Sequence, residues 1–382
     1  MSAWTEWCYA TPTMLLYDHK HIIESSAGVQ QGDPLGPLYF CSGIMQLVND
    51  INALNPVYNK WYMDDGGIVG DEELLKKAWE LIKTRGPEFG LHLNAAKCEF
   101  SWLDADCTLP CPIRLDGVKE EDQVKLIPTS EIQMLGVPLG SDVFTAAFVD
   151  KKLFSRLHTT IGQLVEFEDS QSALYLLRIS FSIVRAVHFM RSTPLRQWKE
   201  QGARFDDLIR DAAEKILGFP MTDETYAQAS LTPTLGGLGL RRTTEHADLA
   251  FSASWHESQE TAAEVWDRPA GVSEELKPQK LASFEFDELM LQRLISQAPT
   301  DRERQRLRRV AQPHACGFLI GVPSEEEDGN DAILRPRNFR TAVAYRLGVP
   351  LFKGEVTCPM CKQTIDVYGD HATCCARRET SS

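Results

Sequence analysis

The stretch NKWYMDDGGIVG, residues 59–70, places two adjacent aspartates between an aromatic run and a pair of glycines. Two neighbouring carboxylates repel each other, so such a pair forms either a solvated hairpin tip or a site that holds a cation. The flanking residues predict strand, tight turn and strand, because Asp-Asp-Gly-Gly can supply the positive backbone angles of a short hairpin. The surrounding segments have to decide between the two alternatives.

An earlier hairpin and two helices are predicted around the aspartate pair. Two extended runs within residues 14–23 enclose a polar turn. Asp33 before Pro34 is the arrangement of an N-cap followed by proline, so a helix is predicted to begin near residue 34. A second amphipathic helix follows the acidic residues 71–73, which favour a helix start. The inward face of the first helix is predicted from its helical spacing to comprise Leu38, Cys41, Ile44, Met45 and Val48.

The order of the predicted elements is that of an α+β protein. Hairpin, helix, hairpin, helix and strand follow one another within residues 1–145, which predicts an antiparallel sheet with helices on one face. Apolar residues at helical spacing dominate residues 146–245 and 246–350, which are predicted to be mainly helical. A cysteine-rich tail, residues 351–382, closes the chain.

The charge of the chain is distributed unevenly. Its formal net charge of -14 is unusual for a protein that binds nucleic acid. Residues 1–150 hold ten Lys and Arg against 22 Asp and Glu, whereas residues 151–242 hold thirteen against ten. A polyanion would therefore meet the middle of the chain, where Arg178 and Arg185 are seven residues apart and would share a helix face. Five further arginines within residues 302–309 are, as an isolated charge run, more typical of a solvated helix face.

Composition also bears on location. No apolar run reaches membrane-spanning length, and the first residues, MSAWTEWCYA, lack the basic start and apolar block of a secretory signal. Ten cysteines in a chain of this length are too sparse for a disulfide scaffold. We therefore expect an intracellular protein without a membrane partner, in either the nucleus or the cytoplasm.

Four of the cysteines cluster near the C-terminus in a pattern typical of a metal site. Cys358 and Cys361 are spaced as Cys-x2-Cys, His371 follows, and Cys375 completes the set, with Cys374 as the alternative fourth ligand. Three thiolates and one imidazole satisfy tetrahedral Zn²⁺, and the small loop that they close needs the metal in order to fold. The sequence therefore predicts a zinc knuckle. This knuckle either binds nucleic acid or only stabilises the fold of the C-terminal tail.

Four segments occur in the order and at the spacing of a known family. They are GVQQGDPLGP, YMDDG, GLHLNAAKCE and MLGVPLG, which begin at residues 28, 62, 90 and 134. Together they resemble the polymerase palm of the reverse transcriptases of non-LTR, LINE-like retrotransposons. The resemblance is clear over residues 10–145 and extends weakly to the C-terminus, where the zinc pattern also resembles that of some retroelement proteins. It implies a partial palm, a helical thumb-like region, a helical connection and a zinc-knuckle tail.

The resemblance implies roles for individual residues. Asp64 and Asp65 would hold two Mg²⁺ ions that activate the primer 3′ hydroxyl and neutralise the nucleotide triphosphate. Lys97 would neutralise or protonate the pyrophosphate leaving group, and an ordinary exposed lysine is the alternative. The partners implied are an RNA template, a DNA primer and dNTPs. The residues placed next to these substrates are Gln31, Gly32, Tyr62 and Met63, with a primer-supporting turn at Leu135 and Gly136.

One aspartate that such a palm requires is missing from its expected place. It should come from a strand before residues 14–23, and the thirteen residues there contain no aspartate. Asp18 lies in the hairpin turn itself and is interpreted as solvated. The chain is thus expected to begin inside the palm and to lack the basic fingers, for which another chain is a candidate source.

Three functional hypotheses follow from these observations. The first is an RNA-directed DNA polymerase domain with an incomplete two-metal site and weak or no activity, because a lost carboxylate removes transition-state stabilisation. The second is a non-catalytic, zinc-dependent nucleic-acid-binding relic that uses the arginine-rich helices. The third is a gene fragment without a functional product, whose exposed sheet edge would promote aggregation.

Overall fold

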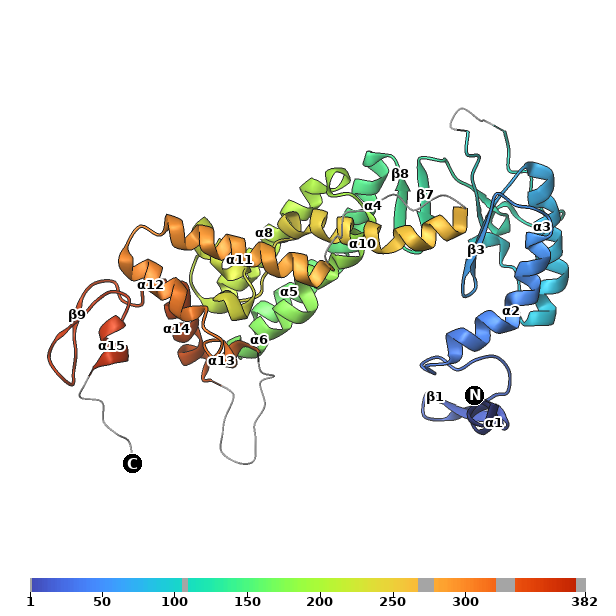
Figure 1. Ribbon diagram of the computed structural model, residues 1–382. Helices are drawn as coiled ribbons and strands as arrows, with labels where there is room; N and C mark the ends of the chain where they lie inside the picture. The colour runs from blue at the N-terminus through green and yellow to red at the C-terminus, as the bar shows by residue number, and fades with distance from the viewer. Residues whose placement is uncertain (1, 105–108, 267–277, 321–333, 376–382) are drawn as a thin grey trace. The chain divides into compact units, whose positions relative to one another are not determined.

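The protein combines short strand pairs with many helices, which confirms the predicted α+β class (Figure 1). The computed structural model describes residues 2–104, 109–266, 278–320 and 334–375. These residues divide into two compact units, Met1–Leu135 and Gly136–Ser382. The division falls in the turn at Leu135 and Gly136, whereas the predicted domain boundaries after residues 145, 245 and 350 remain predictions.

The first unit contains the predicted alternation of hairpins and helices. Its strands pair two by two in the described residues instead of forming one continuous sheet: β1 with β2 and β3 with β4 are antiparallel, and β5 with β6 is parallel. The principal elements are α1 (Ser2–Tyr9), β1 (Thr13–Tyr17), β2 (His21–Ser25), α2 (Gly36–Asn52), β3 (Tyr58–Tyr62), β4 (Asp65–Val69), α3 (Glu72–Arg85), β5 (Glu99–Phe100), β6 (Lys125–Leu126) and β7 (Glu131–Met134).

Helix α2 begins later than predicted. Leu35 is its N-cap and Pro37 lies in its first turn. Asp33 accepts a hydrogen bond from the Leu35 backbone N–H at 2.9 Å and another from the Tyr9 hydroxyl, so it closes a turn before the helix. The Asp-Pro pair therefore precedes the helix as predicted. Asp33 forms an Asx turn instead of the N-cap, so the helix begins at Gly36, two residues later than expected.

The buried face of α2 also differs from the prediction. Ile44, Leu47 and Ile51 are buried, whereas Leu38, Cys41 and Met45 are exposed. The core of this unit is formed by Leu47 and Ile51 with Ala78 and Ile82 of α3, and it therefore covers only the C-terminal half of α2. Helical spacing identifies a face, but the neighbouring elements decide which part of that face is covered.

A buried side chain fastens the β3–β4 hairpin to α2. The Asn59 amide donates to the Val48 carbonyl at 3.2 Å and to Asn52 Oδ1 at 3.0 Å, and its oxygen accepts from Trp61 Nε1 at 2.8 Å. Across the strand pair, Trp61 lies opposite Gly66. A Cβ at Gly66 would lie 2.8 Å from the Trp61 ring, so glycine is required there for steric reasons.

The second unit is helical up to a small terminal module. Its core includes Trp198, Phe205 and Phe339, and α10 packs on α7, α8 and α11. The elements used below are β8 (Val137–Gly140), α6 (Ser170–Leu176), α7 (Val187–Ser192), α8 (Lys199–Leu217), α9 (Asp223–Ser230), α10 (Thr243–Trp266), α11 (Gln279–Gln297), α12 (Asp301–Val310), α14 (Pro336–Leu347), β9 (Val356–Thr357), β10 (Thr364–Ile365) and α15 (Asp370–Cys374). Helices α4 (Asp142–Phe154) and α5 (Leu157–Val165) and the short α13 (Gly317–Ile320) complete the α-helices of this unit in the described residues.

The most apolar segment, Ser170–Ser192, is interrupted. A π-helical turn, Leu177–Phe181, follows α6, and Ser182 leaves the helical conformation before α7. The predicted shared face of Arg178 and Arg185 is therefore absent: Arg178 is half-buried over the Tyr175 ring, and burial lowers the pKa of its guanidinium.

This same segment bears on the expectation about membranes. By length and composition alone, Ser170–Ser192 is a candidate for a membrane span, contrary to the expectation that no run is long enough. Its Leu174, Leu177 and Met190 belong to the core of the second unit, as in the core helix of a globular protein. The segment is therefore weak support for a membrane span.

We expect Gly66→Ala to destabilise the β3–β4 hairpin by about 1 to 3 kcal/mol, because the new methyl group would overlap the Trp61 ring. Gly67→Ala is the matched control, since a Cβ there would lie 3.4 Å from Tyr58, an ordinary contact. Hydrogen exchange of the hairpin amides measures the effect. Equal protection in both variants would contradict the steric explanation.

Candidate functional site

The two adjacent aspartates lie at the exposed tip of the β3–β4 hairpin. Tyr62 pairs with Asp65, so Met63 and Asp64 form the two-residue turn between the strands. Met63 has a φ of 57°, a left-handed angle that glycine usually adopts at this place in a hairpin. The prediction that the Asp-Asp-Gly-Gly run supplies the positive angle is thus wrong, because Met63 supplies it.

The carboxylates of this turn form a pair without a third ligand nearby in the described residues. Among the described residues, groups of three or more potential metal ligands do not include Asp64 or Asp65. Two carboxylates can still ligate a hard cation such as Mg²⁺, which takes oxygen ligands and retains water. The arrangement therefore suits an incomplete cation site.

The other residues predicted to contact substrate are accessible. Gln31 and Gly32 are exposed before α2, and Gly32 has a φ of 92° with open space on its side-chain side. Lys97 is exposed at the end of a 3₁₀ turn, and Tyr62 is exposed at the end of β3. Within the described chain, no hydrogen bond or ion pair joins Lys97 or Gln31 to the two aspartates. Their roles toward substrate remain predictions.

The turn predicted to support a primer is present as a backbone feature. Leu135 has a φ of 49° and Gly136 a φ of 77°. Glycine adopts such an angle without strain, whereas leucine does so at a cost. This conformation is compatible with the predicted role of the turn and does not test it.

The cysteines and the histidine near the C-terminus come together in space. One ligand atom each of Cys358, Cys361, His371 and Cys375 lies within 4.8 Å of all the others. The sulfurs of Cys358 and Cys375 are 3.8 Å apart, and Cys361 Sγ lies 3.0 Å from His371 Nε2. Tetrahedral zinc with Zn–S bonds of 2.3 Å separates two sulfurs by about 3.8 Å. The donor set therefore fits Zn²⁺.

The backbone around the cluster prepares one thiol for metal binding. The N–H groups of Cys361 and Met360 stabilise the Cys358 thiolate and lower its pKa from 9.0 to about 6. The β9–β10 hairpin closes the loop on the other side, with Thr357 opposite Thr364. A thiolate is the form that binds metal, so this loop favours the ligand state at neutral pH.

The structure distinguishes between the two candidate fourth ligands. Cys374 is exposed, and its thiol contacts the Asp370 carbonyl at 3.5 Å. Cys375 is buried and joins the cluster. The hydrophobic cluster of this module consists of Cys358, Ile365 and Cys375 with Cys361 packed against it, which is too little apolar surface to stabilise a fold without metal.

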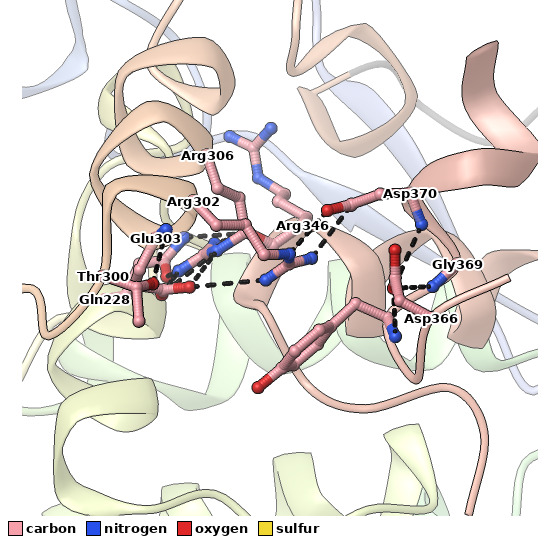
Figure 2. Close-up of polar contacts among 10 residues, drawn as sticks. Gln228, Thr300, Arg302, Glu303, Arg306, Arg346, Asp366, Gly369 and Asp370 are labelled. Atoms are coloured by element: carbon pink, nitrogen blue, oxygen red, sulfur yellow. Dashed lines mark hydrogen bonds and ion pairs between the residues drawn. The ribbon is translucent and has the colours of Figure 1, made fainter. Parts of the chain in front are cut away.

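A residue distant in sequence contacts the module. The carboxylate of Asp370, the residue before His371, accepts two bonds from Arg302 of α12, at 2.5 and 2.9 Å (Figure 2). The Arg302 guanidinium lowers the pKa of Asp370. The arginine run of α12 gave no sequence signal for this pairing, because the two residues are 68 positions apart.

Comparisons with known proteins agree with the resemblance seen in the sequence. Residues 3–139 match the family described as reverse transcriptase (RNA-dependent DNA polymerase). Over 239 residues the chain is 26% identical to the retrotransposable element SLACS 132 kDa protein of Trypanosoma brucei gambiense. The alignment covers 61% of this chain and 19% of the trypanosome protein, so the chain spans about a fifth of that relative.

Replacing the buried and the exposed neighbouring cysteine should separate their roles. We expect Cys375→Ser to lose most of the bound zinc, because it removes one of four ligands, whereas Cys374→Ser keeps it. Zinc per chain after desalting, measured by atomic absorption, reports the result. Zinc loss in the Cys374 variant alone would reverse the ligand assignment.

Proposed function

We propose, taking as premise that this chain carries the reverse transcriptase domain of a non-LTR retrotransposon, that Asp64 and Asp65 bind Mg²⁺ for RNA-directed DNA synthesis. The observation that carries the proposal is the hairpin tip. It exposes two adjacent carboxylates on a strand pair that Asn59 fastens to α2. A rigid support of this kind keeps ligand oxygens in place for a metal.

The remaining parts of the proposed site bind and orient the substrates. Gly32 leaves open space in which a base pair can approach the backbone, and Gln31 beside it can donate or accept hydrogen bonds. Lys97 would neutralise the charge that develops on the pyrophosphate. When bound, Mg²⁺ would lower the pKa of the primer hydroxyl and neutralise the triphosphate.

We further propose that the chain by itself has weak polymerase activity or no polymerase activity. The two carboxylates at the turn have no third acidic partner in the described part of the chain. A two-metal site needs a bridging set of oxygens, so a further carboxylate would have to come from elsewhere, such as another chain. The first hypothesis from the sequence is thereby retained as a proposal.

The terminal module is proposed to be a zinc site that stabilises the end of the chain. Its four donor atoms match the soft ligands and the geometry of tetrahedral Zn²⁺. Arg308 and Arg309 of the neighbouring helix α12 are exposed and available to phosphate. These arginines favour a second candidate function, zinc-dependent binding of nucleic acid without catalysis.

Metal binding at the turn can be tested without turnover. Fe²⁺ supplied in place of Mg²⁺, with ascorbate and peroxide, should cut the chain next to Asp64 and Asp65, because hydroxyl radicals form at the bound ion. Asp64→Asn should abolish the cut. Asp18→Asn, which alters another exposed hairpin-turn aspartate of the same unit, should not. A cut that persists in Asp64→Asn would contradict the metal assignment.

Primer extension on an RNA template with Mg²⁺ tests the reaction itself. We expect little or no incorporation by the wild-type chain, and none by Asp64→Asn. Vigorous, Asp64-dependent synthesis would mean that a third carboxylate acts within this chain, and would contradict the proposed weakness. A template complex that survives Asp64→Asn but dissociates on zinc chelation would favour the second candidate function.

A further inference from the structure

The side chain of Arg302 is held between two residues of the Cys/His module. Its guanidinium carbon lies 3.7 Å from the centre of the Tyr368 ring, while its nitrogens bind both oxygens of Asp370. Figure 2 shows the arginine reaching from α12 toward Asp370. Asp370 directly precedes His371, one of the four potential ligands. The contact thus lies one residue from the candidate metal centre.

Helix α12 is a fixed support for this contact. One turn beyond Arg302, the buried Arg306 binds Glu303, the Gln228 side chain at 2.7 Å and the Arg346 carbonyl. These bonds tie α12 to α9 and α14 in the helical core (Figure 2). Arg302 therefore extends from an element that is anchored independently of the module.

A turn within the module arranges the two residues that meet Arg302. One oxygen of Asp366 accepts from the backbone N–H groups of Tyr368 at 2.7 Å and Gly369 at 2.8 Å. Gly369 has a φ of 81°, which turns the chain into α15. This turn fixes Tyr368 and Asp370 on either side of the arginine.

Besides Arg302, Tyr345 of α14 hydrogen-bonds the Asp370 side chain. Backbone bonds from Leu351 and Phe352 to the Val367 carbonyl, at 2.8 and 2.9 Å, join the two ends of the module to each other and not to the helices. The module's own apolar cluster is small. A charge-assisted, bidentate pair combined with a ring contact is strong compared with such neutral bonds.

We propose that Arg302 is a positioning residue that couples metal binding at the Cys/His cluster to docking of the module, residues 351–375, on α12. The inference rests on the proposed zinc site. Metal folds the loop that presents Asp370 and Tyr368, and the docked arginine in turn stabilises the folded, metal-binding form. Such coupling is reciprocal, so each event must strengthen the other by the same factor.

The first measurement is zinc affinity, by competition with a chromophoric chelator. Arg302→Gln should weaken zinc binding about tenfold, the lower end of the range for groups that support metal ligands. Arg302→Lys keeps the positive charge but cannot donate the two parallel hydrogen bonds of a guanidinium, so it should also weaken zinc binding. Arg308→Gln removes the same charge from an exposed position of the same helix and should leave the affinity unchanged.

The second measurement is hydrogen exchange of α12 with and without zinc. Removing zinc should raise exchange in the first turn of α12 in the wild type and in Arg308→Gln. In Arg302→Gln, zinc should make no difference there, because the link is broken. This readout compares two states of each variant, so a general loss of stability does not imitate it, and Arg302→Lys replaces Arg302→Gln if the latter does not fold.

Two results would overturn the proposal in different ways. Wild-type affinity together with zinc-dependent exchange in both Arg302 variants would disprove the coupling and leave the zinc site intact. A wild-type chain that binds no zinc, measured first as metal per chain, would remove the proposed zinc site and the coupling with it. Only an effect specific to position 302 supports the proposal.

Discussion

Two buried arginines determine how the second unit is assembled. The Arg346 guanidinium binds the carbonyls of Pro233, Gly237 and Ala315, and burial lowers its pKa to about 10. Arg306 binds the Arg346 carbonyl in turn. Removing a guanidinium from water is costly unless its donors find acceptors, so these bonds require the loop after α9, helix α12 and helix α14 to meet in one arrangement. The terminal module depends on that arrangement because it docks on α12.

The first unit shows a comparable constraint on a smaller scale. Its hairpin holds a non-glycine residue, Met63, at a left-handed angle, and the surrounding bonds of Asn59 keep the strands in register on α2. Strained turns of this kind persist where neighbouring structure over-determines them, and they are common at functional sites. Gly66 contributes by leaving room for Trp61 against the strand. The two carboxylates at the tip are therefore held by a hairpin whose position on α2 is fixed.

Local signals in the sequence predicted the local parts of this protein. The hairpin at residues 59–70, the start of α3 at the acidic residues 71–73 and the cysteine spacing all depend on residues close together in the chain. Predictions failed where a distant partner decided the outcome. Cys41 and Met45 are exposed in the described part of the chain, and Arg178 lies over the Tyr175 ring next to a break in the helix.

The sequence alone thus determined the α+β class, the motifs that resemble those of reverse transcriptases, and three of the four potential zinc ligands, because spacing and residue chemistry are sufficient for each of them. Tertiary structure decided which of two adjacent cysteines joins the cluster, which half of α2 is buried and which arginines are available to solvent. Those choices depend on which surfaces meet after folding. Residues far apart in the chain meet only then, and no pattern in the neighbouring residues encodes the pairing.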